Sequence, residues 1–376
     1  KLFNIELSDL TNDYNKQLNS DLLDIFSDNV FEEHDLKNID IKEFSMNSPV
    51  VGEAIRSLYK KYLQNKQDLA LLSDQMISVK QDLSDTAGSE ISSADLISDI
   101  LQSNNNYFIE LEDIAKQESA SIDMKLGHRL KSMILYLKDK FSISVDFAEE
   151  GFKENFSKRY YKEKKLLKIS NTLSRESKEF MIAQQIGLLA ARNAIDRQLE
   201  LNGASDSNSL ALGRTVLANY FASALLMPYD LFWETAEKCR YDIDILRNRF
   251  DTSFEQVCHR LTTLQKDQKK GIPFHFMRVD IAGNVSKRLS MSGLKIPRYS
   301  VACPRWNVYT AFLNPGKIKI QLSKMLDGDT FICIARTVSK RIGDYSSPET
   351  FFSIGLGFDI SHSKDCIYAD NLDEKY

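Results

Sequence analysis

The stretch FMIAQQIGLLAARN, residues 180–193, predicts a buried helix, because apolar residues occupy most of its positions. The polar segment before it offers Ser174 and Ser177 as N-caps, although Ser174 lacks the glutamate three positions later that would complete a capping box. A second apolar segment, LALGRTVLANYFASALLMP, follows a polar loop and stops at Pro228. Two apolar helices therefore define the middle of the chain.

The first of these helices has the frame of a zinc-binding motif without its chemistry. The motif H-E-x-x-H places two histidine ligands on one face of a helix, with a glutamate base between them. When the motif is aligned on the Ile-Gly pair, its three functional positions are occupied by Gln184, Gln185 and Leu188. Neutral glutamine is a poor zinc ligand and a poor base, and leucine is neither. We expect no zinc here and assign no catalytic residue.

The overall composition limits the classes of partner. The chain has 376 residues, with 49 Lys and Arg against 53 Asp and Glu, and a formal net charge of −4. This balance argues against a surface generally coated by nucleic acid, although it allows a local basic pocket. The sequence contains no run of 18 apolar residues, so we expect no membrane-spanning segment.

The cysteines indicate the compartment. They are odd in number, widely spaced and never in a C-x-x-C pair, which is typical of buried thiols in a reducing cytoplasm. They are Cys239, Cys258, Cys303, Cys333 and Cys366. The first residue is Lys rather than Met, so we expect that the natural chain begins earlier.

The clearest periodicity lies in residues 51–83. Apolar positions alternate spacings of four and three, as in the seam of a coiled coil, with one polar member that would fix register and strand number. The seam positions are Val51, Ile55, Leu58, Tyr62, Asn65, Leu69, Leu72, Met76, Val79 and Leu83. The pattern predicts one long helix that pairs with its copy in a homodimer. The alternative is a long helix packed on its own domain.

The pattern of the remaining chain predicts an α+β protein in three parts. Residues 1–84 form a helical linker and dimerisation region, and the Ser/Gly-rich segment 85–95 reads as a hinge. Residues 85–270 are mainly helical with short strands at SISVDF and KKLLKIS. From residue 271 onward, alternating segments such as FHFMRVDI and FFSIGLGFDI, separated by turn residues, predict a mainly antiparallel sheet.

The last third of the chain carries a family resemblance. GIPFHFMRVDIAGNVSKRLSMSGLKIPRYSVACPRWNVYTAF and the segments PGKIKIQLSKMLDGDTFICIARTV and FSIGLGFDISHSKDCIYADNLD strongly resemble the C-terminal domain of the short-chain fatty-acyl transcriptional regulators. LANYFASALLMPY in the middle part also fits that family. The resemblance implies a DNA-binding helix-turn-helix, a zincin-like middle domain and a C-terminal domain that completes an acyl-CoA sensor of propionate or glyoxylate-cycle genes.

The sequence departs from the family plan in two places, the N-terminal helix-turn-helix and a cysteine-rich tail that the family often carries after the C-terminal domain. We therefore expect that this chain does not bind DNA alone and holds no iron–sulfur cluster within residues 1–376. Cys303 matches a cysteine that ligates such a cluster in some relatives. The resemblance also places the third zinc ligand at Thr215, before the Ala218-Asn219 pair. All the metal positions are then lost together, and the cleft between the helices is a candidate place for a small ligand.

An acyl-CoA ligand, such as propionyl-CoA, needs cations for its phosphates, an aromatic or apolar slot for adenine and a small apolar acyl pocket. The candidate phosphate contacts are Arg129, Lys158, Arg159, Arg278, Lys287, Arg288, Arg298 and Arg305. The candidate stacking or pocket residues are Tyr220, Tyr229, Phe274 and Trp306. Strand alternation sends Lys287 and Arg288 to opposite faces, so at most one shares a face with Arg278. For each residue the alternative is an ordinary surface charge or core side chain.

Two other functions are weighed against the sensor. The five histidines, His34, His128, His259, His275 and His362, show no metal spacing, and no nucleophile or nucleotide motif is present. We therefore expect that the chain is not an enzyme. The remaining alternative is a dimeric protein-interaction scaffold with no small-molecule ligand.

Overall fold

The computed structural model describes residues 22, 48, 50–59, 61, 90–148, 157–294, 305–325, 328–340, 349–370 and 372. The chain divides into two compact units, residues 1–70 and 71–376. In the first unit a helix is described over residues 50–59 and at 61, with the seam residues Val51 and Leu58 exposed. The rest of the helix predicted over 51–83 lies outside the described residues, as do Arg298 and Cys303.

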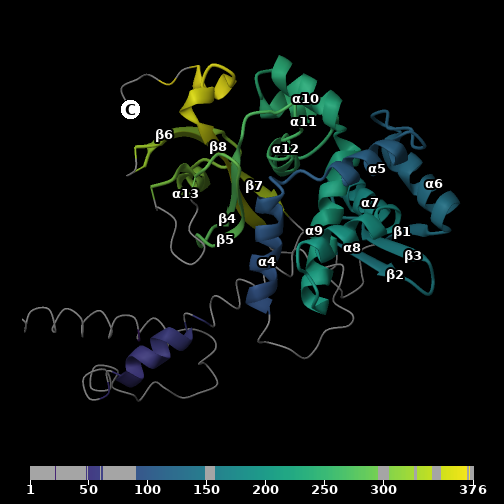
Figure 1. Ribbon diagram of the computed structural model, residues 1–376, viewed down its shortest axis with the longest axis horizontal. Coiled ribbons are helices and arrows are strands. Elements are labelled where there is room, and N and C mark those ends of the chain that lie inside the picture. Colours follow the sequence, from purple (N-terminus) through teal and green to yellow (C-terminus); the bar gives the residue numbers. More distant parts are fainter. Residues whose placement is uncertain are drawn as a thin grey trace, which may run out of the picture. The chain divides into compact units, whose positions relative to one another are not determined.

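The middle part of the second unit is a helical layer against a small sheet (Figure 1). Its helices are α4 (Glu90–Ser103), α5 (Ile109–Ser119), α6 (Arg129–Phe141), α7 (Arg175–Ala190), α8 (Arg192–Leu201) and α9 (Ser207–Leu226). Its strands, in the order β1-β3-β2, are β1 (Ser144–Ala148), β2 (Lys158–Tyr161) and β3 (Leu166–Ser170). Strand β3 pairs in parallel with β1 and antiparallel with β2. The sequence predicted the first and last of these strands but not β2.

The two apolar helices form where the sequence predicted them. Ser174 caps α7 by accepting a hydrogen bond from the Ser177 backbone N–H at 3.3 Å. Helix α7 ends at Ala190, so the predicted single helix over 180–193 is split between α7 and α8. Helices α7 and α9 approach closely at Gly187, where an added Cβ would lie 2.6 Å from the Phe221 ring. Helix α4 begins at Glu90, inside the segment predicted as a hinge.

The C-terminal part combines three helices with a five-stranded antiparallel sheet, which confirms the predicted α+β class. The helices are α10 (Tyr229–Lys238), α11 (Ile243–Phe250) and α12 (Phe254–Leu261). The sheet order is β5-β4-β8-β7-β6, with β4 (His275–Asp280), β5 (Val285–Ser290), β6 (Lys319–Lys324), β7 (Thr330–Lys340) and β8 (Thr350–Asp359).

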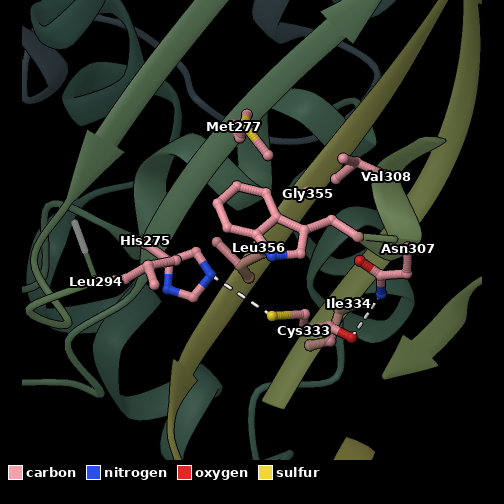
Figure 2. A pocket seen from close by; sticks show the side chains of 10 residues that line it. His275, Met277, Leu294, Asn307, Val308, Cys333, Ile334, Gly355 and Leu356 are labelled. Atoms are coloured by element: carbon pink, nitrogen blue, oxygen red, sulfur yellow. Dashed lines mark hydrogen bonds between the residues drawn. The ribbon is translucent and has the colours of Figure 1, made fainter. Parts of the chain in front are cut away.

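The two faces of this sheet have different cores. One face packs Phe276, Ile354 and Leu356 into a large cluster with the side chains of α10, α11 and α12. The other face carries the short helix α13 (Asn307–Thr310), whose Val308 lies over Gly355 of β8 (Figure 2). We call these the α12 face and the α13 face.

In the described part of the chain no single helix is long and apolar enough to cross a membrane. Helices α9 and α10 meet the length and composition requirement only as a pair bent by 67°. Most of α9 is buried in the protein interior, with thirteen of its residues inaccessible to solvent.

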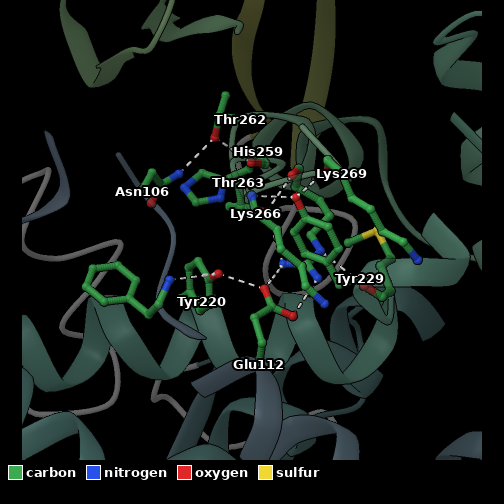
Figure 3. Close-up of polar contacts among 12 residues, drawn as sticks. Asn106, Glu112, Tyr220, Tyr229, His259, Thr262, Thr263, Lys266 and Lys269 are labelled. Carbon is green, nitrogen blue, oxygen red and sulfur yellow. Dashed lines mark hydrogen bonds and ion pairs between the residues drawn. The ribbon is translucent and has the colours of Figure 1, made fainter. Parts of the chain in front are cut away.

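A buried ionic network joins the middle part to the C-terminal part (Figure 3). Arg260 of α12 donates from its two terminal nitrogens to the Glu112 carboxylate of α5, at 2.6 and 2.9 Å. Arg260 also donates to the Met227 carbonyl at 3.0 Å, and the Tyr220 hydroxyl of α9 donates to Glu112 at 2.7 Å. Since Arg260 is fully buried and Glu112 nearly so, the pair holds α5, α9 and α12 in one arrangement.

Glu112→Gln should destabilise the chain by roughly 3 kcal/mol, because it leaves the Arg260 charge buried without its counter-ion. Glu110→Gln on the same helix is the matched control, since Glu110 pairs with Arg197 at a partly exposed site. Its effect should stay below about 1 kcal/mol. Urea unfolding measures both, and equal losses for the two variants would contradict the role given to the buried pair.

Candidate functional site

The two glutamines of α7 that align with the zinc motif, Gln184 and Gln185, share a lysine as their hydrogen-bond partner. Lys158 of β2 donates from Nζ to the Gln184 Oε1 at 2.5 Å and to the Gln185 Oε1 at 3.3 Å. Gln184 in turn donates from Nε2 to the Asn219 Oδ1 of α9 at 2.7 Å. The amine of Lys158 therefore lies against the residues that replace a zinc ligand and the catalytic glutamate of the motif.

Burial controls the chemistry of this lysine. Lys158 is 2% exposed, and Gln184 and Gln185 are also buried. Both of its hydrogen-bond acceptors are neutral amides, so desolvation lowers the pKa of Lys158 from 10.5 to about 7. The sequence suggested Lys158 as a phosphate contact, but its amine points into the interior and is engaged by the two glutamines.

The other two metal positions have ordinary packing roles. Leu188 is partly buried against the helical core. The Thr215 hydroxyl donates to the Ala211 carbonyl one turn earlier, at 3.1 Å. Within the described residues no group of three or more His, Cys, Asp or Glu side chains is placed to hold a metal ion. The residues present do not fit a zinc ion.

Three of the candidate basic residues are paired with buried carboxylates. Arg129 donates from Nε to Glu179 at 2.7 Å and from its terminal nitrogens to two backbone carbonyls. Arg278 and Lys287 both reach Glu255 of α12, at 3.3 and 3.1 Å.

The Glu255 carboxylate has a third cationic neighbour, Lys340, at 2.9 Å. Although burial opposes ionisation, the charges of Lys340, Lys287 and Arg278 hold the pKa of Glu255 well below its ordinary range. Phe352 adds to the cluster, since its ring centroid lies 4.5 Å from the Arg278 guanidinium and 5.5 Å from the Lys340 amine. This cation cluster fastens α12 to the sheet.

The alternation predicted for Lys287 and Arg288 is confirmed. Lys287 pairs in register with Arg278, and both side chains contact Glu255 on the α12 face. Arg288 pairs in register with Met277, which belongs to the α13-face cluster. Arg305 is exposed and Arg159 is partly exposed. Among the described candidate basic residues, Arg278 and Lys287 share a partner, Glu255, while Arg129 and Lys158 each have partners of their own.

Most of the candidate aromatic residues belong to the interior. The Tyr229 hydroxyl donates to the Lys269 carbonyl at 3.0 Å and accepts from the Lys266 N–H at 2.8 Å. Phe274 packs edge-on against Tyr241 and Phe358. Tyr220 belongs to the Glu112 network, and Trp306 lines a small cavity.

This cavity lies on the α13 face of the sheet, and Figure 2 shows most of its lining. Its volume is about 20 Å³. The lining residues are His275, Met277, Leu294, Trp306, Asn307, Val308, Cys333, Ile334, Gly355 and Leu356. The sequence instead suggested the cleft between the two apolar helices as the place for a small ligand. Those helices meet in close contact at Gly187 and Phe221, while the cavity opens between α13 and the sheet.

Comparison with known proteins gives the family. Residues 263–376 match the short-chain fatty acyl coenzyme A regulator C-terminal domain, and residues 137–262 match the IrrE N-terminal-like domain of the M78 peptidases. The HTH-type transcriptional regulator PrpR of Mycobacterium tuberculosis is 31% identical over 375 residues, which cover 98% of this chain and 75% of that protein.

The chain belongs to the short-chain fatty acyl coenzyme A regulator family.

Other relatives agree with this assignment. RamB of Mycobacterium tuberculosis, also an HTH-type transcriptional regulator, is 31% identical over 89% of this chain and 69% of that protein. The propionyl-CoA carboxylase regulator of Cereibacter sphaeroides is 29% identical over 99% of the chain and 78% of that protein. A solved Mycobacterium tuberculosis transcriptional regulator is similar with a TM-score of 0.70 and 34% identity, over 74% of this chain and 86% of that one. The family resemblance drawn from the sequence is confirmed.

The lowered pKa of Lys158 predicts a pH dependence of stability. Between pH about 7 and the ordinary lysine value of 10.5, the unfolded chain binds a proton at this amine that the folded chain does not. The free energy of unfolding therefore rises with pH across this window, by up to about 1.4 kcal/mol per pH unit. Below pH 7 the amine is protonated in both states and contributes no slope.

Lys158→Met removes this amine and should remove that slope. Urea unfolding between pH 6.5 and about 9.5 would measure the difference between variant and wild type as a function of pH. Lys164→Met, at an exposed turn next to β3, controls for the loss of one lysine. A profile for Lys158→Met that runs parallel to the wild-type profile would contradict the assignment.

Proposed function

We propose that this chain is the ligand-sensing and dimerising part of a bacterial regulator that binds a short-chain acyl-CoA to control short-chain fatty-acid metabolism genes. The observation that carries the proposal is the match of residues 263–376 to the short-chain fatty acyl coenzyme A regulator domain. The name of the Cereibacter relative, a propionyl-CoA carboxylase regulator, supports a propionyl-CoA-like ligand. Such a regulator would act in the cytoplasm and contact DNA through a helix-turn-helix outside residues 1–376.

The composition of the former metal site supports a binding role rather than catalysis. A zinc peptidase needs a Lewis-acidic metal and a basic glutamate, and Lys158 with its two glutamine partners supplies neither. The helices of the peptidase-like domain then serve as a scaffold for the sheet domain, fastened to it by Glu255 of α12 with Arg278, Lys287 and Lys340 of the sheet. We propose that the chain is not an enzyme.

Propionyl-CoA should stabilise the chain against thermal unfolding, since a ligand that binds the folded state adds RT ln(1 + [L]/Kd). This term reaches about 2.7 kcal/mol at a hundredfold excess of ligand over Kd.

Native mass spectrometry of the gently purified chain should show bound CoA species and no stoichiometric zinc. Absence of any stabilisation by acetyl-, propionyl- or butyryl-CoA would favour the alternative, a dimeric protein-interaction scaffold.

The seam over residues 51–83 supports a homodimer. Leu58 is 69% exposed and Val51 49% exposed in the single chain, so part of the seam is available to a second copy. Leu58→Lys with Leu69→Lys should therefore give monomers in sedimentation velocity. Ser57→Lys with Gln67→Lys, at positions outside the seam, is the matched control and should stay dimeric. A Leu58/Leu69 variant that remains dimeric would place the interface elsewhere.

A further inference from the structure

The α13 face of the sheet is hollow because small residues stand between larger ones. In register, Gly357 of β8 lies between His275 of β4 and Cys333 of β7. A Cβ at Gly357 would come within 2.4 Å of the His275 Nε2, and one at Gly355 within 2.4 Å of a Val308 methyl. The two glycines therefore leave the space into which the imidazole and α13 settle, with the small cavity between them.

The orientation of the His275 ring is fixed by hydrogen bonds. Its Nδ1 lies 2.8 Å from the Ser292 hydroxyl, which also accepts from the Leu294 N–H at 3.4 Å. The hydroxyl is placed to donate to Nδ1, and in that tautomer the ring proton lies on Nε2. Nε2 has only a weak partner among the described residues, the Cys333 sulfur at 3.8 Å (Figure 2). In that tautomer a buried N–H donor lies at the cavity that His275 and Cys333 line.

The ring stays neutral at physiological pH. His275 is 5% exposed, and burial lowers its pKa to about 3. Burial also raises the pKa of the Cys333 thiol to about 11. A protonated thiol beside a weak base is a poor nucleophile, so the pair suits the binding of a neutral polar group better than covalent chemistry.

We propose that this cavity receives the acyl group of the bound acyl-CoA and that the His275 Nε2–H donates to the thioester carbonyl oxygen. The inference rests on the proposed function and specifies its acyl site. The volume of about 20 Å³ suits one methyl-sized group, since a water-sized group needs about 10–15 Å³ on the same measure. The terminal methyl of a short acyl chain thus fits this space, and a longer chain does not.

Val308→Ala tests the size limit. It widens the cavity beside Gly355, so the affinity for butyryl-CoA relative to propionyl-CoA should rise about tenfold, the usual effect of one methylene in an apolar pocket. Val279→Ala is the matched control, since Val279 belongs to the same buried cluster and sheet face but does not line the cavity. Calorimetry with acetyl-, propionyl-, butyryl- and hexanoyl-CoA on the whole chain measures the ratios. An unchanged ratio in folded Val308→Ala would overturn the acyl site.

His275→Phe tests the carbonyl contact. Wild type should bind propionyl-CoA about tenfold more tightly than propyl-CoA, a thioether of equal chain length without the carbonyl. The variant should bind the two ligands equally. Ser292→Ala, which frees the ring orientation without altering the ring, should lower the preference in the same direction and serves if His275→Phe does not fold. An unchanged preference in the folded variants would overturn the contact.

These measurements distinguish failure of the proposed function from failure of the proposed acyl site. If wild type binds none of the acyl-CoA ligands, the proposed function is wrong. If wild type binds them and every variant keeps the wild-type ratios, the sensor function stands and the acyl site lies elsewhere.

Discussion

The rest of the structure depends on the buried pair of Arg260 and Glu112. A guanidinium removed from water is tolerated only when its donors are satisfied, and Arg260 reaches the carboxylate twice, the Met227 carbonyl and the Thr263 hydroxyl. These contacts come from α5, the end of α9 and α12, so the pair fixes the helix on which the sheet rests. The Asn106 amide, which donates to the Thr262 hydroxyl at 2.9 Å, closes the same junction (Figure 3).

Because α12 is held in place, the side chains on the α12 face of the sheet are used for contacts with this helix. Glu255 draws Arg278, Lys287 and Lys340 together, and Phe352 fills the space between two of them. Basic residues that would suit a phosphate ligand are thereby used to attach a helix. The α13 face is less completely filled, because its strands carry glycine and alanine at the central positions. The cavity lies in the space that these small residues leave.

The positions that align with the zinc motif also contain a buried cationic group with hydrogen-bond partners. A zinc ion supplies positive charge between a helix and its neighbours, and its loss with the histidine ligands would leave a polar gap in the interior. Lys158 fills this gap with an amine that hydrogen bonds to Gln184 and Gln185. The peptidase-like domain thus packs its α7 helix around a buried lysine at the positions that align with the zinc motif.

The sequence by itself determined the features that depend on local spacing. The change to strands after residue 271 and the opposite faces of Lys287 and Arg288 follow from a period of two residues. Alignment with the zinc motif placed Gln184, Gln185 and Leu188 at its functional positions, and Ser174 was one of two candidate caps, of which the structure uses Ser174. Family resemblance added the short-chain fatty acyl coenzyme A regulator family, which the comparisons confirm.

Only the tertiary structure decided which side chains meet. Lys158 lies 26 residues before Gln184 and is brought to it by a strand that the sequence did not reveal. From the sequence, Arg129 was a candidate phosphate contact. In the folded chain it hydrogen bonds to Glu179, 50 residues away. His275, Ser292 and Cys333 converge because strand order and register set them side by side, and these depend on long-range pairing that no local period encodes.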